Sequence, residues 1–160
     1  MSLAAFLLSA VLALSPQQVE VAARITADGQ PECTLYLPDQ TSLPCRPVIT
    51  VIAGARVIGH SSGEVIRLTG AAVRRLNRDE FALLVAHEVA HYYLGHTAST
   101  PAAELAADRL GAALACRAGF SPAAGISVLR FAAAGRTHPR RDVRRMAILA
   151  APCRVPAVTF

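Results

Sequence analysis

The sequence predicts an α+β fold in which a small N-terminal sheet precedes a bundle of helices. Short segments rich in β-branched and apolar residues, the pattern typical of strands, are confined to the first 69 residues. From there onward apolar residues recur at helical spacing, between Pro and Gly residues that mark helix boundaries. Because strands and helices are segregated along the chain rather than alternating, the pattern favours α+β over a parallel α/β sheet.

Length and composition indicate one globular domain, which we assign to residues 16 to 160. The chain has 160 residues, 53% hydrophobic and 17% charged, which excludes a disordered protein. Its formal net charge of +5 comes entirely from arginine, and five arginines fall between Arg136 and Arg145. Such a cluster could bind nucleic acid or an anionic membrane, but no aromatic residues are interleaved with it. We therefore expect a solvated helix face and no nucleic-acid partner.

Residues 1 to 15 have the character of an export signal. Leu3 to Leu14 is apolar apart from Ser9, which is too short to span a bilayer comfortably but is the right length for the apolar core of a secretory signal. No Lys or Arg precedes this stretch, and Pro16 follows the most natural cleavage site. We expect a periplasmic or secreted protein, with a membrane anchor as one alternative. A further alternative is an N-terminal helix packed on the domain.

The four cysteines lack the C-x-x-C spacing of zinc ribbons and thioredoxin-like sites. An even count in an exported chain favours disulfides, for which three pairings are possible. We favour Cys33 with Cys45, which bracket a Pro-containing loop, and Cys116 with Cys153. If the chain is cytosolic, the four residues are simply small and apolar.

Three segments are expected to form short strands: Thr34 to Leu37, Val48 to Ala53, and Glu64 to Leu68. The first long helix is expected over residues 78 to 94. Asn77 and Glu80 have the spacing of a capping box, apolar residues follow at helical spacing, and Gly95 supplies a C-terminal stop.

This helix carries His87-Glu88-Val89-Ala90-His91, the H-E-x-x-H signature of zinc metallopeptidases. The i, i+4 spacing places both imidazoles on one helix face, one turn apart, where they can bind one Zn²⁺. Glu88 lies about 100° around the helix, where it can act as a general base without being a ligand. The alternative is a chance occurrence of two histidines on a helix. A catalytic zinc usually has three protein ligands, so the motif alone is incomplete.

A second helix can supply the third ligand. Thr100-Pro101 is a typical helix start and Gly119 a typical stop, and Glu104 and Asp108 share one face between them. One carboxylate can bind the metal while the other accepts the free N–H of a ligand histidine. The alternative is a solvated pair of acids. Further helices are expected from Pro122 to about Ala134 and from about Arg140 to Ala150.

Several motifs in one order resemble metallopeptidase family 48, which includes the HtpX heat-shock protease, the CAAX prenyl protease and the periplasmic BepA-type proteases. They span roughly residues 48 to 150 and comprise His87-Glu88-x-x-His91, His96, Glu104-x-x-x-Asp108-Arg109-Leu110-Gly111, Ala118-Gly119-Phe120-Ser121-Pro122 and Thr137-His138-Pro139. The resemblance implies a zincin-like gluzincin domain with Glu104 as the third zinc ligand and Asp108 behind a ligand histidine. The stretch between His91 and Glu104 is shorter than in most relatives, and no transmembrane hairpin interrupts it.

The expected function is that of a zinc-dependent endopeptidase acting on protein or peptide substrates, in quality control or processing outside the cytoplasm. In zinc endopeptidases of this kind an edge strand beside the active-site helix receives the substrate as an added strand, and Glu64 to Leu68 is the candidate for that role. A strand that only supports the sheet is the alternative. The competing function is a catalytically silent zinc-binding scaffold or chaperone-like module. The presence of Glu88 favours the enzyme.

His138 is the last candidate site residue. It lies between Gly135 and Pro139, on an expected loop between two helices. In the resembled family a His-Pro loop at the matching place lies over the active site. We therefore expect His138 either to cap the zinc in a resting state or to stabilise the oxyanion during turnover, with a plain surface histidine as the alternative.

Overall fold

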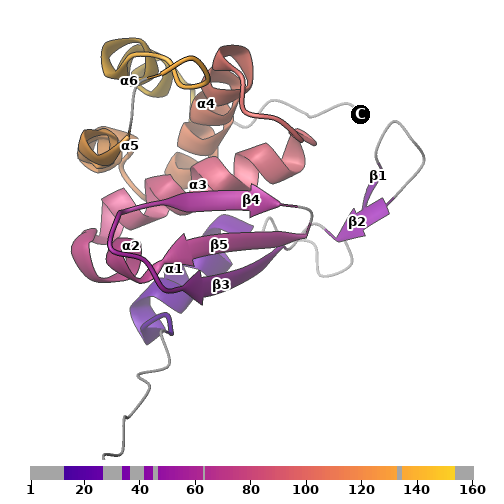
Figure 1. Cartoon of the computed structure of the whole chain (residues 1–160), viewed down its shortest axis with the longest axis vertical. Coiled ribbons are helices and arrows are strands. Elements are labelled where there is room, and N and C mark those ends of the chain that lie inside the picture. The colour runs from indigo at the N-terminus through magenta and orange to yellow at the C-terminus, as the bar shows by residue number, and fades with distance from the viewer. Residues whose placement is uncertain are drawn as a thin grey trace, which may run out of the picture.

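The computed structural model describes residues 13–26, 34–36, 42–44, 47–62, 64–132 and 135–153. Within these ranges a three-stranded sheet lies on one side of the long helix α3 (Arg78–Tyr93), and α4 (Pro101–Arg117), α5 (Pro122–Gly125) and α6 (Arg141–Leu149) lie on the other side (Figure 1). The predicted α+β architecture is confirmed.

The three-stranded sheet consists of β3 (Val48–Ile52), β4 (Gly59–Ser62) and β5 (Val65–Thr69), in the order β3-β5-β4. β3 is parallel to β5 and β4 is antiparallel to it. β5 is therefore the central strand, and its Ile66 and Leu68 are fully buried. The prediction that residues 64 to 68 form the edge strand was wrong, because the sequence Gly-His-Ser-Ser of β4 lacks the β-branched and apolar residues by which strands are recognised.

A separate hairpin pairs β1 (Thr34–Tyr36) with β2 (Ser42–Pro44) in antiparallel register. The first of these strands was predicted and the second was not. The pairing predicted between Cys33 and Cys45 falls outside the described residues. The other predicted disulfide, Cys116 with Cys153, is present and ties the end of α4 to the segment after α6.

The boundaries of α3 and α4 agree with the sequence prediction. Asn77 caps α3 through a complete capping box with Glu80, and the α3 C-terminus turns at Gly95 with a φ of 62°. Thr100 caps α4, with Pro101 at its first turn. These local signals are strong enough to fix both helices that carry the site.

The predicted helix from Pro122 to Ala134 is instead a short α5 followed by the 3₁₀ helix η1 (Ile126–Phe131). A 3₁₀ helix aligns side chains three residues apart. This spacing lets Ser127 and Arg130 both bond the carboxylate of Glu80 at the start of α3. The tertiary contact thus favours the tighter helix.

Within the described residues, two further helices precede α3. α1 (Pro16–Thr26) packs on α3 through Val21 and Ile25, and α2 (Gly70–Arg75) follows β5 directly. The sequence did not indicate α1. Most of the predicted signal segment, residues 1 to 12, lies outside the described part of the chain. Among the described residues, no helix is long and apolar enough to cross a membrane.

Candidate metal centre

Two helices bring the predicted site residues together. His87, Glu88 and His91 lie on α3, and Glu104 and Asp108 lie on α4, which packs directly against it. A Cβ at Gly111 would be 2.9 Å from the backbone of His87, so only glycine permits this close crossing. Asp108 and Glu104 lie on the same face of α4 as Gly111, one turn and two turns earlier respectively, and therefore face the two histidines.

The donor atoms of His87, His91 and Glu104 lie within 4.8 Å of one another. The two Nε2 atoms are 3.0 Å apart; Nε2 of His87 lies 3.5 Å from Glu104 Oε2, and Nε2 of His91 lies 3.5 Å from the other carboxylate oxygen, Oε1. Donors bound to zinc at about 2.0 to 2.1 Å in tetrahedral geometry are separated by roughly 3.3 Å. The three side chains therefore fit a tetrahedral metal ion with its fourth position open. This places a candidate metal-binding group at the predicted ligands.

The second ring nitrogen of His87 is held by Asp108 and Arg144. His87 Nδ1 lies 3.0 Å from Asp108 Oδ1. Arg144 donates from Nε and Nη2 to the two oxygens of Asp108, at 2.8 Å and 2.7 Å. A carboxylate on Nδ1 places the ring hydrogen there, which leaves the Nε2 lone pair free for a metal. Asp108 thus occupies the position expected for it.

The second ring nitrogen of His91 is held by His96. The two Nδ1 atoms are 2.9 Å apart. Gly95 reverses the chain at the end of α3, where the His96 N–H bonds the His91 carbonyl, and this turn folds the His96 ring back over its neighbour. If His91 Nε2 held a metal, its Nδ1 would carry the ring hydrogen and donate it to His96. His96 was not predicted as a site residue, although it is one of the residues on which the resemblance to metallopeptidase family 48 rests.

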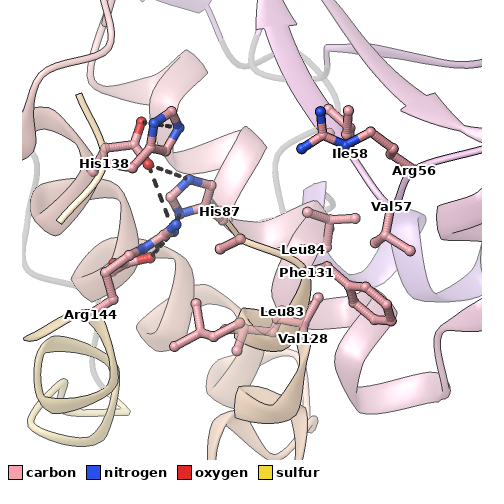
Figure 2. A pocket seen from close by; sticks show the side chains of 15 residues that line it. Arg56, Val57, Ile58, Leu83, Leu84, His87, Val128, Phe131, His138 and Arg144 are labelled. Atoms are coloured by element: carbon pink, nitrogen blue, oxygen red, sulfur yellow. Dashed lines mark hydrogen bonds and ion pairs between the residues drawn. The ribbon is translucent and has the colours of Figure 1, made fainter. Parts of the chain in front are cut away.

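Arg144 was also missed. The arginines between residues 136 and 145 were interpreted as a solvated face, but Arg144 is 6% exposed and points into the site beside His87 (Figure 2). Arg144 shares its buried helix face with Ala147 and Ile148. That i, i+3, i+4 pattern was the available signal that one arginine of the cluster is buried.

Burial and neighbouring charges set the protonation of the three donor groups. Burial lowers the pKa of His87, but its contacts with Asp108 and Glu104 outweigh this and raise the pKa to about 9. Burial raises the pKa of Glu104, but contacts with His87 and Ser99 bring the pKa down to about 2. Burial and the neighbouring His87 lower the pKa of His91 to about 4, so its ring is neutral. An anionic carboxylate with imidazoles is a donor set that suits Zn²⁺.

Glu88 lies between this group and strand β4. The side chain is 6% exposed, and burial raises the pKa of its carboxyl. A Cβ at Gly59 would be 2.7 Å from Glu88 Oε1, so the strand backbone runs directly against the carboxylate. Glu88 and His91 line a cavity of about 350 Å³ along β4, and His87 lines a second cavity of about 260 Å³. Glu88 is therefore placed to act on a group held between the metal ligands and the strand.

His138 lies over the site but outside the group of three donors. Its Nε2 is 3.8 Å from Glu104 Oε1, and its Nδ1 is 2.8 Å from the Thr137 hydroxyl. If Nδ1 accepts the hydroxyl hydrogen, Nε2 carries the ring hydrogen and presents it to the site. His138 lines both cavities, so the described structure brings all five histidines of the chain to this one region.

The chain matches no family model, no curated protein and no solved structure. The resemblance to metallopeptidase family 48 therefore rests on the sequence motifs alone, and the chemistry proposed below rests on the residues of this chain.

Replacing Arg144 with lysine tests the second layer of the site. Lysine keeps the positive charge but loses the two-pronged bond to Asp108, so we expect zinc affinity to fall roughly 10-fold, within the range typical of such outer partners. Zinc affinity is measured by competition with a chelator of known affinity. Arg145→Lys, the same change on the exposed neighbour, is the matched control. Equal affinities in the two variants would show that Arg144 does not position the ligand.

Proposed function

We propose that this chain is a zinc-dependent endopeptidase. The observation that supports it most strongly is the convergence of His87, His91 and Glu104 with donor separations of 3.0 to 3.5 Å, next to a carboxylate that is not a ligand. The three ligands would hold a Lewis acid that polarises the substrate carbonyl, and Glu88 supplies the base. A site that only bound metal would not need Glu88 held between the ligands and a strand edge.

The roles of the side chains follow from their positions. Zn²⁺ held by the three ligands would polarise a peptide carbonyl and lower the pKa of a water molecule at its open position. Glu88 accepts the proton of the attacking water and then donates it to the departing amine nitrogen. Asp108 and Arg144 keep the His87 ring in one tautomer and one orientation.

We propose that the substrate backbone adds to β4. In the described sheet β4 pairs with β5 along one edge only, and its other edge faces the cavity lined by Glu88 and His91. An extended peptide can pair with the free N–H and C=O groups of such an edge. Because Gly59 lies against Glu88, the peptide bond opposite Gly59 is the one placed for cleavage. This role was expected for residues 64 to 68, which the sheet order excludes.

A catalytically silent zinc-binding scaffold is the second candidate, and a degradation assay separates the two. Purified protein loaded with one equivalent of zinc is incubated with unfolded casein, with and without chelator. The endopeptidase is expected to produce fragments only when zinc is bound, and metal content is measured on the same samples. Stoichiometric zinc with no fragments would favour the scaffold.

His138 is proposed to donate a hydrogen bond to the oxyanion, because it approaches Glu104 without joining the donor group. His138→Ala should then lower kcat/KM by roughly 10²- to 10³-fold with zinc affinity unchanged. His138→Gln keeps a side-chain N–H donor and should recover part of the loss. If His138 instead caps the zinc, the alanine variant will cleave faster than the parent protein, and this opposite sign would overturn the assignment.

The proposed location is outside the cytoplasm, in the periplasm or secreted, and the proposed partners are protein or peptide substrates. The disulfide between Cys116 and Cys153 supports this location because such bonds persist in oxidising compartments. The apolar N-terminal segment supports it as an export signal or membrane anchor. No nucleic-acid role is proposed, since Arg144, the one buried arginine of the described cluster, serves the metal site.

A further inference from the structure

The second cavity at the site has a mainly apolar lining. It opens beside His87 and Arg144 and has a volume of about 260 Å³. Figure 2 shows side chains of α3 and η1 forming one side, namely Leu83, Leu84, Val128 and Phe131. Val57 and Ile58, in the segment that leads into β4, form the facing side. The cavity therefore joins the metal ligands to a compartment suited to an apolar group.

The charged groups of this cavity lie at its metal-site end and at Arg56. Arg144, Glu104 and Asp108 line the end at the metal site, where Arg144 contacts both carboxylates. Arg56 lies on the facing wall and is exposed. An ammonium group placed among the leucine, valine and phenylalanine side chains would lose its hydration without gaining a partner, and the one cation on the facing wall for a carboxylate is Arg56, which is exposed to solvent. An apolar group would bury its surface there at no such penalty.

The position of the cavity along β4 indicates which substrate residue reaches it. Gly59 lies against Glu88 and marks the scissile bond. Residues 56 to 58 line the apolar cavity, whereas His60 and Ser61 line the other cavity, on the far side of Gly59. A peptide that adds antiparallel to β4, the better-paired orientation, runs from the Ser61 side toward residues 56 to 58. The residue that follows the scissile bond then lies at the apolar cavity.

We infer that this cavity selects a large apolar side chain, such as leucine, phenylalanine or methionine, on the residue immediately after the scissile bond. The inference rests on the proposed peptidase function and adds its substrate class. Burial of such a side chain favours binding by roughly 10- to 100-fold over a side chain left in water. The unfolded apolar segments that soluble proteins normally bury would be the preferred substrates, since they carry these residues in extended backbone.

Ala132 provides a variant that narrows the cavity. It is half-buried, lines the cavity at the end of η1 and has an extended backbone that leucine adopts freely. Ala132→Leu is therefore expected to reduce cleavage before leucine and phenylalanine by roughly tenfold and to shift the preference toward alanine and valine. Ala123→Leu, the same change on the exposed side of α5, is the control and should leave the preference unchanged.

The first measurement maps the bonds cleaved in unfolded casein by mass spectrometry of the fragments. We expect leucine, phenylalanine and methionine to be enriched at least tenfold over aspartate and glutamate at the new N-termini, with no comparable enrichment at the new C-termini. Cleavage without this preference, or with the preference before the bond, would overturn the inference while the peptidase function stands. An unchanged profile in Ala132→Leu would overturn it as well.

The second measurement is binding, which does not depend on turnover. Zinc-loaded Glu88→Gln protein is titrated with a blocked hexaalanine peptide that carries leucine or aspartate at its fourth position. We expect the leucine peptide to bind at least tenfold more tightly, and Ala132→Leu to abolish the difference. Selective binding by this variant, together with a zinc-loaded parent protein that cleaves no casein, would support the pocket and overturn the peptidase. Equal binding of the two peptides would overturn the pocket.

Discussion

Glu88→Gln should abolish proteolysis while zinc remains bound. Glutamine has the shape of glutamate and leaves all three ligands in place, but its amide cannot accept a proton from water. General acid–base catalysis typically contributes 10²- to 10⁴-fold, and we expect kcat to fall by about that factor. The measurement pairs the initial rate of casein cleavage with the zinc content of the same sample, because a variant that lost its metal would be inactive for another reason.

The matched control is Glu20→Gln, the same change at an exposed carboxylate on α1. It should leave both rate and zinc content unchanged. If Glu88→Gln cleaves at a rate comparable to that of the Glu20 variant, Glu88 is not the base. The general base would then have to be sought among the remaining polar groups that line the cavity along β4.

The elements that could be predicted from sequence are those whose signals are local. The capping box at Asn77, the Thr100-Pro101 start of α4 and the Gly95 stop lie next to the helices that they delimit, and both helices begin and end close to the predicted residues. The i, i+4 spacing likewise placed His87 and His91 on one face before any tertiary contact was known.

Strand β4 could not be predicted, because its position depends on contacts distant in sequence. Gly59 is required by the close approach of the Glu88 carboxylate, 29 residues later, and His60 and Ser62 are exposed. β propensity reflects burial against neighbours, and little of β4 is buried. Without β4 in the predicted sheet, residues 64 to 68 are expected at its edge, whereas the observed order places β5 in the centre.

The sequence also could not decide between Glu104 and Asp108 as the metal ligand without the family resemblance, since both lie on one face of α4. The distances distinguish them. Glu104 reaches the Nε2 atoms of both histidines, whereas Asp108 meets His87 at Nδ1 and is held there by Arg144. Arg144 comes from α6, 36 residues beyond Asp108, so no local pattern connects the two.

Glu104→Ala should remove the third ligand and with it most of the zinc affinity. Loss of an outer partner typically lowers metal affinity 10- to 100-fold, so the loss of a direct ligand should exceed about 100-fold. The site would be left with two imidazoles, one fewer ligand than catalytic zinc usually has. The measurement is a competition titration with a chelator of known affinity, together with circular dichroism to show that α3 and α4 remain folded.

Asp108→Asn is the comparison variant, because it separates the loss of a direct ligand from the loss of an outer partner. The asparagine leaves the three donors intact but weakens the hold on the His87 ring, so zinc should still bind, with an affinity about 10- to 100-fold below that of the parent protein. The expected order of affinities is parent, then Asp108→Asn, then Glu104→Ala. If Glu104→Ala kept the parent affinity, Glu104 would not be a ligand. If the two variants were reversed in order, Asp108 would be the direct ligand and the roles of the two carboxylates on α4 would have to be exchanged.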